Sequence, residues 1–131
     1  MPASTYLANK IYDHVYRNTA YTSPTTVYVA LFTSSSSLAA LKAGTLTNEV
    51  SGGSYARVAV TMGAPTDGDG SAGTVTFTTA TAGWGTVRFF AYMDASTSGN
   101  VLTYGQLTSD VTINNGNTFQ FNSGSLAATV D

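Results

Sequence analysis

The apolar positions near the start of the chain repeat with the period of an α-helix. Leu7, Ile11 and Val15 are four residues apart, and residues 4–17 contain neither Gly nor Pro. This spacing places the three side chains on one helical face, and the Ser-Thr pair that opens the segment can supply an N-cap oxygen. We therefore expect a helix over about residues 4–17. Because a helix of this length is marginal in isolation, its apolar face must pack either on the protein's own sheet or on a partner.

From residue 25 onward the pattern changes to that of β-strands. Short runs rich in β-branched and aromatic residues alternate with clusters of Gly, Asn, Asp and Ser, which is typical of strands separated by turns. Residues 95–100 are a turn-rich stretch between two such runs and predict a hairpin. The expected strands cover residues 26–33, 57–62, 74–78, 85–94, 101–107, 110–113, 118–121 and 125–130.

Two connecting segments have patterns of their own. Residues 34–44 begin with four serines and continue with an apolar stretch that ends in Gly, which indicates one or two helical turns. Residues 65–73 are rich in Gly and Asp and are expected to form a flexible loop. Neither segment is long enough to separate two domains.

The order of these elements predicts the fold class. The βαβ alternation of a parallel sheet is missing, and short strands with regular turns are typical of antiparallel sandwiches and barrels. We therefore expect a single, mainly β domain over residues 1–131. It consists of one N-terminal α-helix and, over about residues 25–130, an antiparallel β-sandwich (jelly-roll-like or immunoglobulin-like) of seven to eight strands.

Composition then narrows the function. Only 9% of the residues are charged and the net charge is −2, so the clustered Lys and Arg that bind nucleic acid are missing. The absence of Cys excludes disulfides and thiolate metal sites. No segment has the apolar length of a membrane span, and the first residues do not read as a secretory signal. We expect neither nucleic acid nor membrane as a partner, and synthesis in a cytoplasm without signal-dependent export.

Catalytic chemistry has few candidate residues. The one histidine, His14, lies in the predicted helix and away from any Gly-x-Ser-x-Gly turn, so we interpret it as a helix histidine near a polar surface. A glycosidase needs two carboxylates across a cleft, and Glu49 with Asp94 or Asp110 has no spacing that favours such a pair. Glu49 is expected to be a solvated acid before a turn. We predict no catalytic residue, no cofactor and no enzymatic activity.

The Asp-Gly-Asp-Gly stretch at residues 67–70 is the one segment with the look of a metal loop. Calcium loops place oxygen ligands at alternate positions, and an EF-hand also needs a Glu at its twelfth position and flanking helices. Both are missing here, so a turn in which Asp and Gly supply special backbone angles is favoured. We predict no metal site, and Asp67 and Asp69 are the residues that a cation would use.

Aromatic residues crowd the first 21 positions. Tyr12 and Tyr16 are one helical turn apart, and tyrosine is favoured at interfaces because its ring is buried while its hydroxyl stays paired. Packing in the protein's own core explains the same pattern equally well. Trp84, at the entrance to a strand, is expected to be a core anchor. The candidate partner interface is therefore the helix face formed by Tyr6, Leu7, Ile11, Tyr12, Val15 and Tyr16.

The order of these blocks resembles that of small virion structural proteins of tailed bacteriophages. The resemblance covers nearly the whole chain, from the helix at residues 4–14 to the hairpin at residues 94–102. Its most specific parts are Glu-Val-x-Gly-Gly-x-Tyr-Ala-Arg at residues 49–57 and Gly-Trp-Gly at residues 83–85. Proteins of this kind are often labelled tail-fibre-like, and related β-sandwich proteins sit on capsids as cement or decoration subunits.

The resemblance implies a non-enzymatic structural protein of the virion, made in the host bacterial cytoplasm. The main hypothesis is a decoration (cement) protein that binds the major capsid protein on the capsid surface, together with copies of itself, for which a trimer fits the three-fold positions of the shell. The alternative is a receptor-binding or glycan-binding protein of a tail fibre or tail tip. A glycan hydrolase is a third hypothesis. Low charge allows many copies to pack closely without long-range repulsion.

Overall fold

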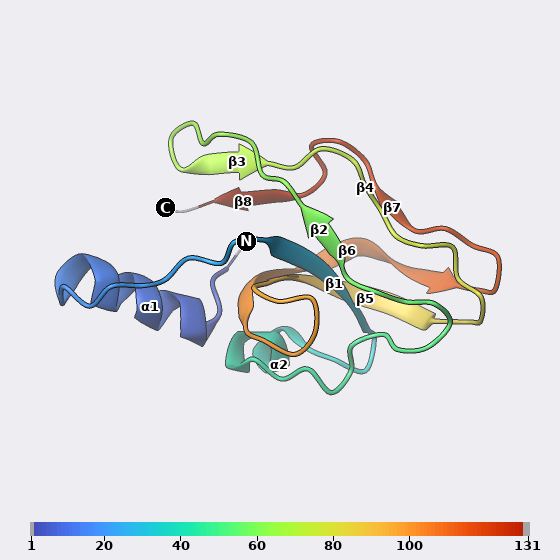
Figure 1. The fold of residues 1–131 in the computed structure, drawn as a ribbon. Coiled ribbons are helices and arrows are strands. Elements are labelled where there is room, and N and C mark those ends of the chain that lie inside the picture. The colour runs from blue at the N-terminus through green and yellow to red at the C-terminus, as the bar shows by residue number, and fades with distance from the viewer. Residues whose placement is uncertain (1, 130–131) are drawn as a thin grey trace.

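A four-stranded antiparallel sheet lies at the centre of the fold in the computed structural model, which describes residues 2–129 (Figure 1). Its strands follow the order β2 (Val58–Val60), β1 (Val27–Thr33), β5 (Gly85–Met93) and β6 (Val101–Ile113). β5 and β6 form the predicted hairpin around residues 95–100. β2 and β6 are therefore the outer strands of this sheet.

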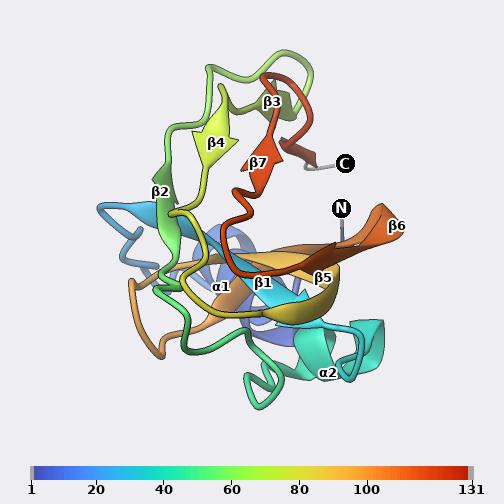
Figure 2. The same ribbon diagram turned by 90° about the vertical axis from the view of Figure 1, so that its right-hand side faces the viewer.

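Two short ribbons form a second layer over one face of the sheet (Figure 2). In one ribbon β3 (Asp69–Ser71) pairs with β8 (Ala127–Thr129), and in the other β4 (Val75–Thr76) pairs with β7 (Gln120–Phe121), both antiparallel. Within residues 2–129 the structure thus has eight strands, all paired antiparallel. The predicted mainly β, antiparallel fold is confirmed, and its two layers are arranged like those of a sandwich.

β1 is buried on both of its faces from Val29 to Phe32, which explains why this part of its sequence is continuously apolar. Val29 and Leu31 belong to the core between the sheet and the ribbons, whereas Ala30 and Phe32 belong to a second core on the opposite face. Successive side chains of a strand point to opposite faces, so a strand between two cores has no position for a polar residue.

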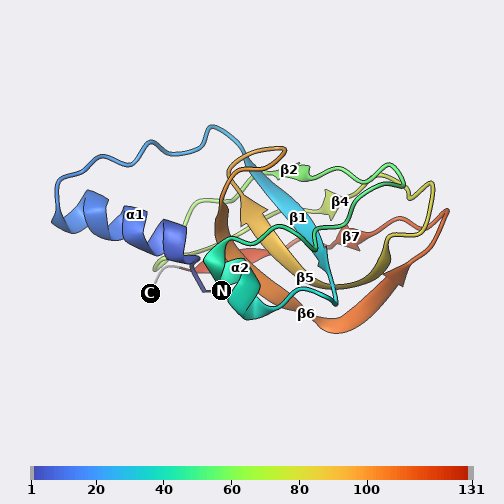
Figure 3. The ribbon, with the colours of Figure 1, turned by 90° about the horizontal axis from the view of Figure 1, so that it is seen from below.

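The second core lies under the short helix α2 (Leu38–Ala43), which covers the sheet face opposite the ribbons (Figure 3). Ser37 caps this helix by accepting a hydrogen bond from the Ala40 N–H at 3.0 Å. Gly44 ends it in the left-handed conformation, at φ 85°. Leu41 is completely buried in the second core. The helical turns expected within residues 34–44 are confirmed.

The structure corrects two of the predicted boundaries. Residues 65–73 are not a structureless loop, because β3 lies within them and residues 66–69 form a tight hairpin. The two strands expected at residues 101–107 and 110–113 are one strand, β6. The strand expected at residues 125–130 is β8, and residue 130 lies outside the described residues.

The predicted N-terminal helix is confirmed as α1 (Thr5–Tyr16), with Ser4 as its N-cap. α1 projects from the side of the sandwich rather than lying across the sheet (Figure 1). Among the described residues, no helix is both long enough and apolar enough to span a bilayer.

Candidate partner interface

The first turn of α1 is fixed to the edge of the sheet by Ser4. This residue is completely buried, and its N–H donates to the Leu102 carbonyl oxygen at 2.8 Å. Its hydroxyl donates to the carbonyl oxygen of Val101 and accepts from the Leu7 N–H, with 3.1 Å between Oγ and N. One side chain therefore serves both as helix cap and as anchor, so the start of α1 has a defined position on β6.

Beyond its first turn, α1 moves away from the body of the protein. Tyr6 and Leu7 are half-buried and pack against the core between the sheet and the ribbons. The later apolar side chains are exposed, and no α1 residue is fully buried. We call the exposed set the helix patch; it consists of Ile11 (37% exposed), Tyr12 (58%), Val15 (62%) and Tyr16 (75%).

The helix patch is one continuous surface on two adjacent turns. The rings of Tyr12 and Tyr16 have their centroids 5.1 Å apart, and Ile11 and Val15 have the same four-residue spacing. The six candidate interface residues thus divide into two half-buried residues that pack against the protein's own core and four whose side chains are exposed. The sequence pattern cannot make this division, because all six positions fit one amphipathic helix.

The segment that follows α1 turns back along the helix and braces it. The Tyr21 N–H donates to Nδ1 of His14 at 3.1 Å, and the rings of Tyr6 and Tyr21 meet edge to face with centroids 6.5 Å apart. Asp13 and Arg17 form an exposed ion pair at 3.0 Å. The single histidine of the chain thus accepts a backbone hydrogen bond in a helical arm, which agrees with its interpretation as a helix histidine.

Glu49 lies in a hydrogen-bonded cluster rather than at a solvated turn, contrary to the sequence-based expectation. Its carboxylate accepts two bonds from Arg57, Nε to Oε2 at 2.8 Å and Nη2 to Oε1 at 2.7 Å, and a third from the Tyr55 hydroxyl at 2.8 Å. The side chains of Arg57 and Glu49 are only 3% and 17% exposed. Burial removes water from both ions, so each depends on the other.

The same cluster ties three distant parts of the chain together. Nη1 of Arg57 donates to the carbonyl oxygens of Ala95 and Ser98 in the β5–β6 hairpin loop, at 2.8 and 2.7 Å. The Tyr55 hydroxyl accepts from the Leu31 N–H of β1 at 3.0 Å. Burial, followed by the nearby Glu49 charge, raises the pKa of Tyr55 above its ordinary value, and the hydrogen bond with Glu49 raises the pKa of Arg57.

The two most specific sequence blocks meet at Trp84. Its indole N–H donates to the Gly53 carbonyl oxygen at 2.9 Å, and its ring meets that of Tyr55 edge to face, with centroids 5.4 Å apart. Trp84 is 4% exposed, so its prediction as a core anchor is confirmed. A Cβ at Gly53 would lie 2.8 Å from the indole nitrogen, which requires Gly at this position. The blocks at residues 49–57 and 83–85 therefore have a structural role, because their contacts join two segments that are distant in sequence.

The remaining candidate carboxylates also have structural partners. Asp94 accepts from the backbone N–H and the side-chain amide of Asn100, at 2.7 and 2.9 Å, and so closes the β5–β6 hairpin loop. Asp110 accepts two bonds from Arg88, at 2.9 and 2.7 Å, on the surface. The guanidinium group lowers the pKa of Asp110. These bonds give both carboxylates a role in holding the strands.

The Asp-Gly-Asp-Gly segment forms the turn between residues 66 and 69. The backbone groups of Thr66 and Asp69 exchange two hydrogen bonds, at 2.8 and 3.0 Å. Asp67 and Gly68 between them have φ values of 53° and 78°, which two-residue hairpins of the Asp-Gly type require. Among residues 2–129, no group of three or more His, Cys, Asp or Glu side chains is placed to hold a metal ion.

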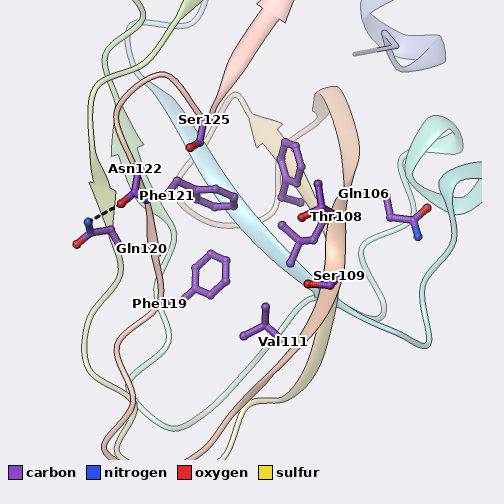
Figure 4. A pocket seen from close by; sticks show the side chains of 11 residues that line it. Gln106, Thr108, Ser109, Val111, Phe119, Gln120, Phe121, Asn122 and Ser125 are labelled. Carbon is purple, nitrogen blue, oxygen red and sulfur yellow. Dashed lines mark hydrogen bonds between the residues drawn. The ribbon is translucent and has the colours of Figure 1, made fainter.

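A groove that the sequence did not reveal opens between β6 and β7 (Figure 4). It has a volume of about 510 Å³. Aromatic and aliphatic side chains form much of its lining, and amide and hydroxyl groups provide the rest. The groove is built from β5, β6 and the segment around β7, which come together only in the folded state.

Comparison with known proteins identifies the family of the chain. The family model described as "Podophage GP4 fiber I protein gp80" matches residues 2–129, and no curated protein gives a significant match. The match covers nearly the whole chain and confirms the resemblance to small structural proteins of tailed-phage virions. On this evidence the chain belongs to the podophage GP4 fiber I protein gp80 family.

Proposed function

We propose that the protein is a structural subunit of a tailed-phage fibre or fibre-like appendage, held to a neighbouring virion protein by the helix patch. The observation that carries the proposal is the exposure of Ile11, Tyr12, Val15 and Tyr16 on a helix that projects from an otherwise well-packed sandwich. Contiguous exposed apolar side chains are typical of surfaces that another protein covers.

The contacts that hold α1 in place favour binding of its exposed face to a partner protein. Its first turn is fixed to β6 through Ser4, and the bond from Tyr21 to His14 braces its last turns. A helix that is already ordered loses less conformational freedom on binding than a flexible segment does. An amphipathic helix presented in this way suits docking of its apolar face into a groove on the partner.

The family description supports a fibre as the location, because it names a fibre protein. The hydrogen bonds and ion pairs of the carboxylates in the sandwich support a structural rather than an enzymatic role. Each of the carboxylates Glu49, Asp94 and Asp110 is bound to a partner that holds two segments of the chain together. In this proposal the sandwich is a rigid module of the appendage and α1 is its attachment point.

Decoration of the capsid is the second candidate. Its support is the low charge of the chain, 9% charged residues with a net charge of −2, which permits dense packing of copies on a shell. In that case the helix patch binds the major capsid protein, and a trimer at three-fold positions is the expected assembly.

The test is to place Val15→Ser and Tyr16→Ser together in the phage and to measure how much of the protein purified virions contain. Asn9→Ser, at an exposed α1 position outside the helix patch, is the matched control. We expect the double variant to be lost from virions, the control to be retained, and the thermal unfolding of the isolated proteins to stay within a few degrees of each other. Undiminished incorporation of the double variant would overturn the proposal that the patch is the attachment point.

Copy number and cryo-microscopy of the same virions decide between the two locations. A fibre subunit is expected in roughly a dozen to a few dozen copies at the tail, whereas a decoration protein occurs in hundreds of copies across the shell. Density for the sandwich on the capsid surface would replace the fibre assignment with the decoration assignment.

A further inference from the structure

The groove between β6 and β7 lies at the open side of the sandwich, where β6 is an outer strand of the sheet and β7 belongs to the second layer. Its lining contains four consecutive residues of β6, 106–109, and four consecutive residues around β7, 119–122. Successive side chains of a strand point to opposite faces, so a groove over one face contacts every second residue. Contact with consecutive residues therefore places the backbone edges of both strands at the groove, and the core-facing side chains of Phe90, Leu107 and Val111 form its interior.

Both strands have an edge available at this place. β6 is an outer strand of the four-stranded sheet, and within residues 2–129 β7 pairs with β4 alone. The pairing of β6 with β5 is also interrupted here, because Val87 is opposite Val111 but Phe89 is opposite Gln106. Residues 107–110 thus have no register partner on β5, which is the geometry of a bulge in an edge strand.

The same edge of β6 already pairs with an extended segment next to the groove. Ala3 forms an antiparallel bridge with Thr103, and the Tyr104 N–H donates to the Pro2 carbonyl oxygen at 3.3 Å. The groove begins two residues further along β6, at Gln106. This edge is therefore able to bind an added strand, and the groove continues the line of an existing backbone pairing.

The lining of the groove defines the chemistry of its occupant. None of the lining residues carries a charge, so a charged occupant would lose its water without gaining an ion partner. Figure 4 shows Val111, Phe119 and Phe121 directed into the groove, with the Ser109 hydroxyl at its side, whereas the amides of Gln106 and Gln120 point away from it. The apolar members are Phe90, Leu107, Val111, Phe119 and Phe121, and the polar members are Gln106, Thr108, Ser109, Gln120, Asn122 and Ser125.

We infer that this groove binds an extended, uncharged polypeptide segment of another subunit, which is added as a strand beside β6. Alternate side chains of the segment lie against Phe119 and Phe121, and its backbone pairs with the β6 edge at residues 106–110. Strand addition of this kind uses main-chain hydrogen bonds for affinity and side-chain pockets for specificity. The inference concerns a second surface, distinct from the helix patch, and does not depend on where in the virion the protein sits.

The probe is a capped seven-residue peptide of alternating Thr and Val, titrated into the isotopically labelled full chain and followed by NMR. We expect saturable shifts of the amide signals at residues 106–111 and 119–122, and slower hydrogen exchange at residues 107–110. No saturable shift at millimolar peptide, or shifts confined to other parts of the protein, would overturn the inference.

Two lysine substitutions provide the matched comparison. Ser109→Lys places a charge at the exposed rim of the groove, whereas Thr112→Lys places one at an exposed β6 position that does not line it. We expect at least about tenfold weaker peptide binding for Ser109→Lys and unchanged binding for Thr112→Lys. Equal binding by both would overturn the inference. Saturable shifts with maltoheptaose but not with the peptide would also overturn it, and would assign the groove to an uncharged oligosaccharide.

Discussion

Arg57 and Glu49 form a two-pronged ion pair that is almost closed to solvent. The two nitrogen–oxygen distances are 2.8 and 2.7 Å, and the Arg57 side chain is 3% exposed. The third guanidinium nitrogen reaches the hairpin loop through the carbonyl oxygens of Ala95 and Ser98. A single side chain therefore links the block at residues 49–57 to the hairpin between β5 and β6.

Replacing Arg57 with Met is expected to destabilise the protein by about 3 kcal/mol. The substitution keeps much of the apolar stem but leaves the Glu49 carboxylate buried without its cation, and breaking one side of a buried pair typically costs roughly 3–5 kcal/mol. The lower end applies because Glu49 keeps 17% exposure. The measurement is the free energy of unfolding in urea.

The control for this prediction is Arg88→Met. Arg88 also forms a two-pronged pair, with Asp110, but the two side chains are 38% and 41% exposed, and exposed pairs contribute little. We expect its unfolding curve to be close to that of the natural chain. Equal losses in the two variants would contradict the structural role assigned to Arg57.

Substitution of Gly52 and of Gly53 by Ala is expected to lower the stability of the protein by measurably different amounts. Both have positive φ, 76° and 57°, and an L-residue in this region costs roughly 1–2 kcal/mol. A Cβ at Gly52 meets no atom within 4 Å, whereas one at Gly53 lies 2.7 Å from the Ala82 carbonyl oxygen. Gly53→Ala is therefore expected to lose about 1–3 kcal/mol more than Gly52→Ala, because the close contact adds strain. Differential scanning calorimetry of the two variants tests this, and equal melting temperatures would contradict it.

Leu7 and Val15 lie on the same helical face but are expected to differ in their contribution to stability. Leu7 packs against the core, so Leu7→Ala is expected to cost about 2 kcal/mol, at the low end for Leu because the site is only half-buried. Val15 is 62% exposed, so Val15→Ala is expected to change stability by less than about 0.5 kcal/mol. Urea unfolding of each variant measures the difference. A loss at Val15 as large as that at Leu7 would show that the helix patch packs on the protein itself.

Ionisation of the buried Tyr92 hydroxyl is expected to lower the stability of the protein at alkaline pH. Burial raises its pKa to about 12 from an ordinary value of 10.0, and its hydroxyl donates to the Ala127 carbonyl oxygen at 3.2 Å. The folded state therefore favours the neutral phenol. This contribution to stability is fully present below pH 10 and is lost as the pH rises from 10 to about 12.

Urea unfolding between pH 8 and pH 12 measures this dependence. Tyr92→Phe removes the titrating group, so we expect a smaller fall in stability between pH 10 and 12, together with a loss of about 1 kcal/mol at neutral pH from the missing hydrogen bond. Tyr55 also has a raised pKa, so some of the fall remains in the variant. An unchanged fall in Tyr92→Phe would contradict the role of this residue.

The sequence predicted those elements whose signals are local. The spacing of Leu7, Ile11 and Val15 predicted α1, and the run of β-branched and aromatic residues at 26–33 predicted β1. The turn-rich residues 95–100 predicted the hairpin between β5 and β6. Each depends on side chains within one or two turns or along one strand, so the pattern alone contains the information.

The sequence-based prediction failed where the environment of a residue depends on segments that are distant in sequence. The turn with special backbone angles expected in the Asp-Gly-Asp-Gly stretch is confirmed at Asp67 and Gly68, but residues 65–73 were interpreted as a flexible loop, and the turn closes a hairpin whose second strand pairs with β8. Glu49 was interpreted as solvated because Gly residues follow it. Its true environment depends on Arg57 and Tyr55, whose side chains meet it only in the folded state.

By itself the sequence determined the fold class, the helix at the N-terminus and the lack of a recognisable catalytic motif, since each follows from periodicity or from residue types. Only the tertiary structure decided which part of the helix face is covered and which is exposed, and only it brought β6 and β7 together around a groove. The physical reason is that exposure and concave shape depend on contacts between segments distant in sequence. Helical periodicity groups Leu7 with Val15, but contact with the core separates them.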